Sequence, residues 1–236
     1  MSETNQQGTL SEPTLLDRSV EFFHSLNSIP GLVHGFILRN PAIDVVVDRE
    51  VALARLQPHY DSVLGELKIE PDHFWTGEQV HGSNVEFCDP KTGPARHFPD
   101  TDGLVTAAKG EFLGIFVADC GAVFLVDPKK QVCGLVHSGK NGTEQQIAVR
   151  AIERMREEFG SDPADLIVQL APCIRPPAYE VDFAVQIVAD CIEAGVPEGQ
   201  MHDCGTCTSL DLERYYSYRV EKGKTGRMLA VLGFSE

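Results

Sequence analysis

The chain has 236 residues, of which 42% are hydrophobic and 23% charged, an ordinary composition for a globular protein with a sizeable core. Its formal net charge of −15 argues against a nucleic-acid partner, because phosphate backbones are bound by clustered Lys and Arg. No apolar run reaches the roughly 20 residues that span a bilayer, so we expect no membrane partner. The polar start lacks the basic and apolar regions of a signal peptide. We therefore expect a cytoplasmic protein with a frayed N-terminus and seven reduced cysteines.

The first half of the chain predicts a short lead-in followed by a mixed segment. Residues 1–30 are expected to form a partly flexible lead-in that closes at a Pro-Gly turn, and residues 31–236 a single domain. Helical spacing covers residues 48–69, and Pro58 is predicted to break this helix into two pieces. Residues 74–89 alternate enough for one or two strands, with a bend at His81 and Gly82.

The second half contains clearer strand and helix signals. Strands are predicted at 112–120 and 122–128, joined near Gly121, and a third at 132–139. A long helix follows at 143–160, with Thr143 as its N-cap and its end near Gly160. A buried strand at 165–174, a helix at 184–196 and a final strand at 226–234 complete the chain. Because no strict βαβ rhythm is present, we expect one α+β domain rather than a doubly wound sheet.

Three residues that could carry chemistry stand where apolar segments give way to Gly-bearing turns: His81, Cys120 and His137. Two imidazoles and one thiolate suit zinc, and three protein ligands leave the fourth position for water or substrate. Two other interpretations stay open. Cys120 is a small core residue and the histidines are hydrogen-bonded loop residues, or Cys120 is a nucleophile with His137 or His81 as its base.

Other polar positions have weaker signals. Asp119 can orient a ligand histidine, act as a general acid or base, or simply accept backbone amides at a turn. The pair Cys204 and Cys207 has redox or zinc spacing, but no second CxxC motif accompanies it, so a structural role is favoured. The segment HSGKNGT, residues 137–143, offers amides that can bind an anion, yet it matches no phosphate-loop fingerprint.

Seven motifs occur in the order typical of a known family: HGFILR, EQVHGSNV, DTDGLVT, FVADCGAVFLVDP, GLVHSGKNGT, LAPCIRPPAYEV and CTSLDLERYYSYRVEKGKTGRMLAVL. They cover most of the chain from about Gly31 onward. In these motifs the chain resembles the bacterial YfiH-like proteins. That family was once called multicopper polyphenol oxidases, or laccase-like proteins, and is now described as purine nucleoside phosphorylases. Some members are named peptidoglycan editing factors.

The resemblance implies a four-layer α/β/β/α sandwich with mixed sheets and one zinc ion held by His81, Cys120 and His137. Copper is less expected, because a laccase reaction needs several copper ions and one good metal site is evident. The implied activities are phosphorolysis of adenosine, inosine and methylthioadenosine, and deamination of adenosine. The partners would be a purine nucleoside and phosphate, and the protein a monomer or homodimer. The candidate catalytic residues are Asp119 and the three ligands, and the candidate substrate-binding residues are Arg39, Gln79, Lys140, Asn141 and Arg219.

The chain departs from the family pattern at the expected anion contacts. Where relatives read HAGWRGT, this sequence places Lys140 at the tryptophan and Asn141 at the arginine, and Val220 replaces the second arginine of SYRR. Lys140 carries a charge but not the planar, bidentate contact of arginine to phosphate. The zinc set is thus better supported than phosphorolysis. The alternatives are a Cys120-dependent hydrolase or amidase of cell-wall precursors and a non-catalytic nucleoside-binding relative.

Overall fold

A computed structural model describes residues 13–236 of the protein. The expected frayed start lies mostly outside these residues. Strand β8, Gly121–Asp127, shows how the sequence builds the layers of the protein. Every residue of β8 is buried, and successive side chains leave opposite faces. Phe124 and Val126 pack into the core between two sheets, whereas Val123 and Leu125 pack beneath helices. An apolar run of this kind therefore needs a layer on each side.

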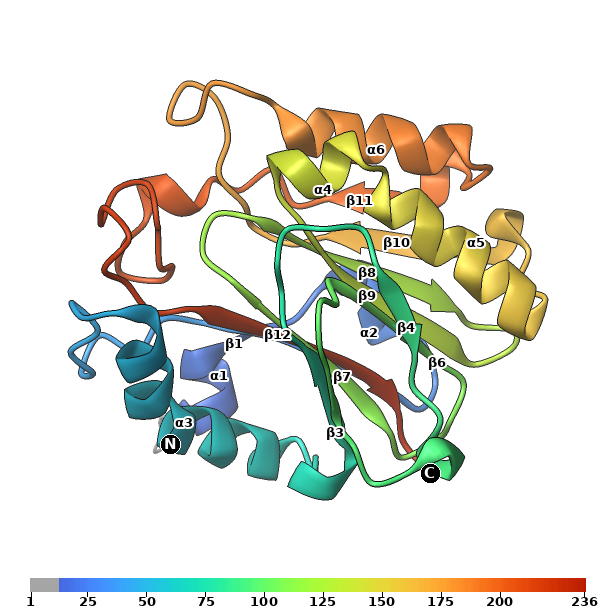
Figure 1. Cartoon of the computed structure of the whole chain (residues 1–236), viewed down its shortest axis with the longest axis horizontal. Helices are drawn as coiled ribbons and strands as arrows, with labels where there is room; N and C mark the ends of the chain where they lie inside the picture. Colours follow the sequence, from blue (N-terminus) through green and yellow to red (C-terminus); the bar gives the residue numbers. More distant parts are fainter. Residues whose placement is uncertain (1–12) are drawn as a thin grey trace, which may run out of the picture.

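Two six-stranded mixed sheets lie face to face (Figure 1). The first has the order β1-β2-β12-β7-β3-β5 and comprises β1 (Val20–Glu21), β2 (Leu32–Ile37), β3 (Phe74–Gly77), β5 (His97–Phe98), β7 (Phe112–Val117) and β12 (Met228–Phe234). The second has the order β11-β10-β8-β9-β6-β4 and adds to β8 the strands β4 (Val85–Phe87), β6 (Gly103–Thr106), β9 (Val132–Ser138), β10 (Ile167–Leu170) and β11 (Met201–Asp203).

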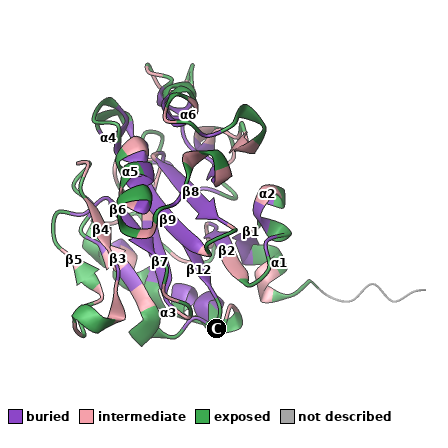
Figure 2. Cartoon of the chain, turned by 90° about the vertical axis from the view of Figure 1, so that its right-hand side faces the viewer, coloured by how far each residue is buried: buried purple, intermediate pink, exposed green. Residues whose placement is uncertain are grey.

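Helices cover the outer face of each sheet. Helices α5 (Ile147–Phe159) and α6 (Phe183–Glu193) lie over the second sheet, with the short helix α4 (Lys140–Glu144) before them (Figure 1). Helix α3 (Arg49–Glu66) lies under the first sheet beside α1 (Leu15–Ser19). Figure 2 shows the buried strands enclosed between these helical layers. The expected α+β domain with four layers is thus confirmed.

Residues 13–30 belong to the same body as the sheets. Strand β1 pairs antiparallel with β2, and α2 (His24–Asn27) contacts β2 and β10. Leu26 of α2 is fully buried in the core between the sheets. Throughout residues 13–236, the helices are too short or too polar for any of them to cross a bilayer.

Two helix predictions were wrong in detail. Helix α3 continues through Pro58, which lies exposed on the same face as Ala54. The Ala54 carbonyl loses its helical donor there, but on a solvent-facing side water replaces the bond while the opposite face stays packed. The long helix predicted from Thr143 instead begins at Ile147, because Gln146 adopts a left-handed φ of 56°. Its expected end at Gly160, with φ 66°, is confirmed.

Candidate metal centre

The turn that carries Cys120 connects the two sheets. Strand β7 ends at Val117 in the first sheet, and β8 begins at Gly121 in the second. The predicted strand end at Cys120 was therefore three residues too late, and the two strands are not paired with each other. Between them, Asp119 adopts a left-handed φ of 80°. This crossing places the Cys120 thiol at the edge where both sheets meet.

Asp119 holds this turn against the C-terminal part of the chain. Its Oδ1 accepts the Thr208 hydroxyl at 2.7 Å, and its Oδ2 accepts the Ser217 hydroxyl at 3.1 Å and the Arg219 amide at 2.7 Å. The Asp119 carbonyl accepts the Ile174 amide at 2.8 Å. The Asp119 carboxylate thus positions the turn. The role of orienting a ligand histidine, which was considered for Asp119, belongs to Asp102.

The structure brings together His81, Cys120 and His137, whose ligand atoms all lie within 4.8 Å of one another. His137 lies on β9 opposite Ala122 of β8, next to the turn. His81 lies in the loop after β3, with a left-handed φ of 63°. Its ring meets that of His137 edge to face, with centroids 4.8 Å apart. In residues 13–236 this is the one cluster of at least three His, Cys, Asp or Glu side chains with metal-binding spacing.

Asp102 organises the cluster, although sequence reasoning missed it. Its fully buried carboxylate accepts the amides of Val80, His81 and Gly82 at 3.1, 3.0 and 2.8 Å. The same carboxylate lies 2.8 Å from Nδ1 of His137. One side chain therefore fixes both histidines. The available signal was its place in the motif DTDGLVT, residues 100–106, directly before β6.

The charges in the cluster favour a thiolate. Burial raises the pKa of Cys120, but the His137 charge and hydrogen bonds from His137 and His81 outweigh burial and bring the pKa to about 6. Burial lowers the pKa of His137, but the Cys120 charge and the Asp102 carboxylate outweigh it and raise the pKa to about 9. Burial raises the pKa of Asp102, yet hydrogen bonds from His137 and Gly82 bring it below its usual value.

These residues fit a metal ion in three respects. The donor set of two imidazoles and one thiolate is that of a three-ligand zinc site. The hydrogen bond from Nδ1 of His137 to Asp102 leaves Nε2 free to coordinate, which is the usual arrangement of a carboxylate behind a metal-bound histidine. Gly139 leaves room for the sulfur, since a Cβ there would lie 2.5 Å from Sγ of Cys120.

The cluster opens into a cavity of about 720 Å³. The rings of Phe116, Tyr179, Phe183 and Tyr218 line it, together with the predicted substrate residues Gln79, Lys140, Asn141 and Arg219. The amide of Gln79 is already committed, because it exchanges hydrogen bonds with the Phe116 backbone at 2.6 and 2.9 Å. Arg219 pairs with Glu180 at 2.7 Å. Lys140 and Asn141 are exposed at the cavity.

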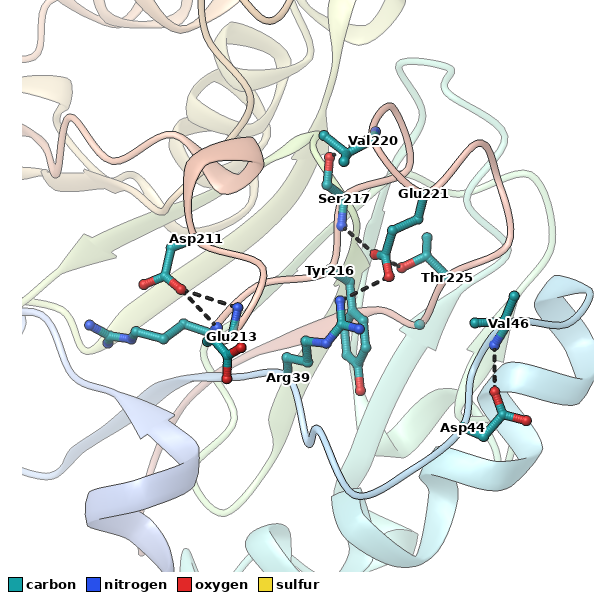
Figure 3. Close-up of polar contacts among 12 residues, drawn as sticks. Arg39, Asp44, Val46, Asp211, Glu213, Tyr216, Ser217, Val220, Glu221 and Thr225 are labelled. Carbon is teal, nitrogen blue, oxygen red and sulfur yellow. Dashed lines mark hydrogen bonds and ion pairs between the residues drawn. The ribbon is translucent and has the colours of Figure 1, made fainter.

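Arg39, the fifth predicted substrate residue, does not line this cavity. Its guanidinium pairs with Glu221 at 2.9 Å and lies over the Tyr216 ring, 5.0 Å from the centroid (Figure 3). The same carboxylate accepts the Ser217 amide at 3.1 Å and the Thr225 hydroxyl. The substrate contact expected for Arg39 stays a prediction, and in this structure its side chain braces the loop that carries Glu221.

The cysteines of the CxxC segment lie apart from the cluster. The backbone of Cys207 forms an isolated parallel β-bridge with that of Cys173. The Cys207 thiol lies 3.0 Å from the Ser209 hydroxyl. Both Cys204 and Cys207 are half-buried free thiols. Among the described residues, Cys204 and Cys207 belong to no cluster of side chains with metal-binding spacing. A structural role therefore stays the simplest interpretation.

Two packed sheets, with a His-Cys-His site at the edge where the sheets meet, define the class of this protein. A family profile described as multi-copper polyphenol oxidoreductase laccase matches residues 48–190 and 182–235. The chain belongs to this family, as its motifs predict. The family supports metal binding at the site.

Curated relatives similar to this chain include two bacterial proteins. The purine nucleoside phosphorylase YlmD of Bacillus subtilis is 30% identical over 165 residues, which cover 58% of this chain and 59% of that protein. The purine nucleoside phosphorylase of Deinococcus radiodurans is 34% identical over 192 residues, covering 71% of this chain and 72% of the relative. The matched region is thus less than two thirds of the Bacillus subtilis protein.

Among solved structures, the hypothetical protein YfiH of Bacillus licheniformis superimposes with a TM-score of 0.82. The match covers 93% of this chain and 98% of that chain at 22% identity. This likeness establishes that the two proteins share a fold.

Proposed function

We propose that this protein is a zinc-dependent enzyme that cleaves purine nucleosides by phosphorolysis. The observation that carries the proposal is the convergence of two imidazoles and one thiolate within 4.8 Å at the wall of a cavity of about 720 Å³. A cavity of this size suits a small-molecule ligand. The relatives described as purine nucleoside phosphorylases supply the reaction class.

His81, Cys120 and His137 would hold one zinc ion, with the fourth position open to water or substrate. When bound, zinc supplies Lewis-acid polarisation of an oxygen atom. We favour zinc over copper because a laccase reaction needs several copper ions, and the described residues form one donor cluster. The role of Asp102 is to keep His137 in the tautomer that presents Nε2.

The remaining lining suits a nucleoside and an anion. The rings of Phe116, Tyr179, Phe183 and Tyr218 offer apolar faces on which a purine can stack. Basic side chains on the same wall suit a phosphate co-substrate. Deamination of adenosine is the second activity we propose for this site, because it needs an activated water at the same place rather than phosphate.

A Cys120-dependent hydrolase is a second candidate, favoured by one observation. Cys120, His137 and Asp102 are arranged as a nucleophile, its base and the group that orients the base. The lowered pKa of Cys120, about 6, provides a thiolate at neutral pH. This candidate would act on an amide or ester, such as that of a cell-wall precursor.

The test combines metal analysis with turnover of inosine and adenosine. The proposal predicts about one zinc per chain and phosphate-dependent release of hypoxanthine from inosine, both lost after chelation and restored by zinc. The hydrolase would be established instead if metal-free protein cleaves an amide. That activity should persist after chelation and be lost after thiol alkylation. Nucleoside binding without turnover would indicate the non-catalytic relative, and Asn141→Arg is then the informative reversal.

A further inference from the structure

The cavity wall is basic although the protein is acidic. The chain has 35 acidic and 20 basic side chains, yet five basic residues line the cavity: Arg49, Lys140, Arg219, Lys222 and Arg227. One carboxylate lines it, that of Asp119, and this group already accepts two hydroxyls and an amide. Of the five cations, Arg219 pairs with the Glu180 carboxylate, at 2.7 Å.

Four of these cations, Arg49, Lys140, Lys222 and Arg227, form no ion pair within the described residues, and two of the four are arginines. Seven other arginines in residues 13–236 pair with a carboxylate: Arg39, Arg55, Arg96, Arg154, Arg175, Arg214 and Arg219. In an acidic chain, pairing is thus the common state of an arginine. Arg18, Arg150 and Arg156 form no ion pair within residues 13–236 either, but they are exposed away from the cavity, so Arg49 and Arg227 differ from them by lining it.

Arg227 is held in place by groups that do not neutralise it. Its Nη1 donates to the carbonyls of Thr225 and Gly226 at 3.1 and 2.8 Å, and its guanidinium lies 5.9 Å from the Tyr218 ring centroid. Nε and Nη2 make no hydrogen bond to another described residue. The Tyr60 hydroxyl donates to the Arg227 carbonyl at 2.7 Å, which ties this segment to α3, the helix that begins at Arg49.

The carboxylate in the same loop is directed elsewhere. Glu221 accepts Arg39, the Ser217 amide and the Thr225 hydroxyl, and all three contacts appear in Figure 3. Both of its oxygens are therefore used. Arg39 and Glu221 thus neutralise each other, and neither lines the cavity.

The guanidinium groups of Arg49 and Arg227 line the same cavity. Burial lowers the pKa of Arg227, and the charge of Arg49 lowers it further. The charge of Cys120 acts in the opposite direction, and Arg227 lines the same cavity as His81, Cys120 and His137. Two cations on one cavity wall repel each other, and an anion bound in the cavity would relieve this repulsion.

We propose that Arg49 and Arg227 form a subsite for a phosphate group beside His81, Cys120 and His137. The planar guanidinium makes paired hydrogen bonds to phosphate oxygens, which Lys140 cannot make. The proposal deepens the proposed function and rests on it for the reaction, since it supplies the anion contact absent at Asn141. The phosphate group can come from inorganic phosphate or from a phosphate ester of a nucleoside, since both present the same oxygens.

Calorimetric titration of inorganic phosphate into the full chain tests the subsite without turnover. Arg49→Gln and Arg227→Gln should each weaken phosphate binding by about tenfold or more, and Arg227→Lys by less, because the charge remains. Arg156→Gln is the matched control, since this exposed arginine on α5 forms no ion pair within residues 13–236. Equal phosphate binding by the double variant and the unmodified protein, or no binding by the unmodified protein, overturns the proposal.

A competition experiment separates the two sources of phosphate. Inosine 5′-monophosphate that displaces inorganic phosphate, and loses its own affinity in both glutamine variants, identifies a phosphate ester. Inosine that binds together with inorganic phosphate identifies the free anion. Phosphate binding that needs both arginines but accompanies no phosphorolysis supports the subsite and refutes the proposed reaction. Phosphorolysis with an unchanged phosphate KM in the double variant refutes the subsite alone.

Discussion

The Nδ1 atom of His137 lies 2.8 Å from Oδ1 of Asp102, and the His137 amide donates to the Asp102 carbonyl at 2.7 Å. The two residues are thus joined through both side chain and backbone. Because the Asp102 carboxylate also accepts three amides of the His81 loop, it sets the separation of the two histidines. The geometry of the cluster therefore depends on a residue that coordinates nothing.

Replacement of Asp102 should weaken metal binding. Asp102→Asn keeps the side-chain shape but removes the charge and part of the hydrogen-bond acceptance, so zinc affinity should fall by about 10–100-fold. Competition with a chromophoric chelator measures this affinity. Asp165→Asn is the matched control, since this carboxylate pairs with Lys129 away from the cavity. Unchanged zinc affinity in Asp102→Asn would show that the histidines are positioned without it.

A methyl group at Gly139 should displace the Cys120 thiol. The added Cβ of Gly139→Ala would lie 2.5 Å from Sγ, which is too close for van der Waals contact, so the thiol must move away from the histidines. We expect loss of zinc binding with little change in thermal stability. Gly199→Ala is the control, because its Cβ meets no atom within 4 Å. Full zinc binding by Gly139→Ala would exclude the close sulfur position.

Asp119 should matter more for stability than for proton transfer. Asp119→Ala removes a buried acceptor of three hydrogen bonds and places alanine at a φ of 80°, so the free energy of unfolding should drop by about 3 kcal/mol. Asp119→Asn should lose less, because asparagine tolerates this φ and keeps one acceptor oxygen. Urea unfolding provides the measurement. Unchanged stability combined with lost turnover would instead identify Asp119 as a catalytic acid or base.

His34 should make the protein sensitive to acid. Burial lowers the pKa of His34 to about 4, and its Nε2 accepts the Phe23 amide at 3.0 Å. The unfolded chain binds the proton more readily than the folded chain, so this contribution is complete above about pH 6.5 and is lost as pH falls towards about 4. The expected loss is at most about 3 kcal/mol.

Urea unfolding between pH 7 and pH 4 measures the contribution of His34. His34→Gln should flatten the decline over this range, because glutamine accepts the same amide and does not titrate. His24→Gln, at an exposed histidine on α2, should leave the decline as it is. Identical pH dependence in His34→Gln and the unmodified protein would contradict the account.

Much of the fold followed from local patterns, and the misses have physical causes. The strands at 121–127 and 132–138 were predictable because both are continuously apolar and end at turn residues. Hydrophobic alternation does not say which sheet a strand joins, so the crossing at Ala118–Cys120 was not foreseen. The break at Gln146 depends on tertiary packing, since the Thr143 hydroxyl contacts Ser138 instead of capping a helix.

The candidate site shows the same division. His81, Cys120 and His137 were identified because each stands where an apolar segment meets a glycine, and the fold brings these points together. Asp102 lies in a loop rich in proline, glycine and aspartate, where a carboxylate is unremarkable by composition. Arg49 and Arg227 are 178 positions apart in the sequence, and that they line one cavity is visible only in the folded chain.

X-ray absorption at the zinc edge of the purified protein tests the central claim most directly. The account predicts about one zinc per chain with two nitrogen ligands and one sulfur ligand from protein, and loss of the sulfur contribution in Cys120→Ser. Protein that binds no zinc when the ion is supplied, or a zinc spectrum that contains no sulfur ligand, would contradict it.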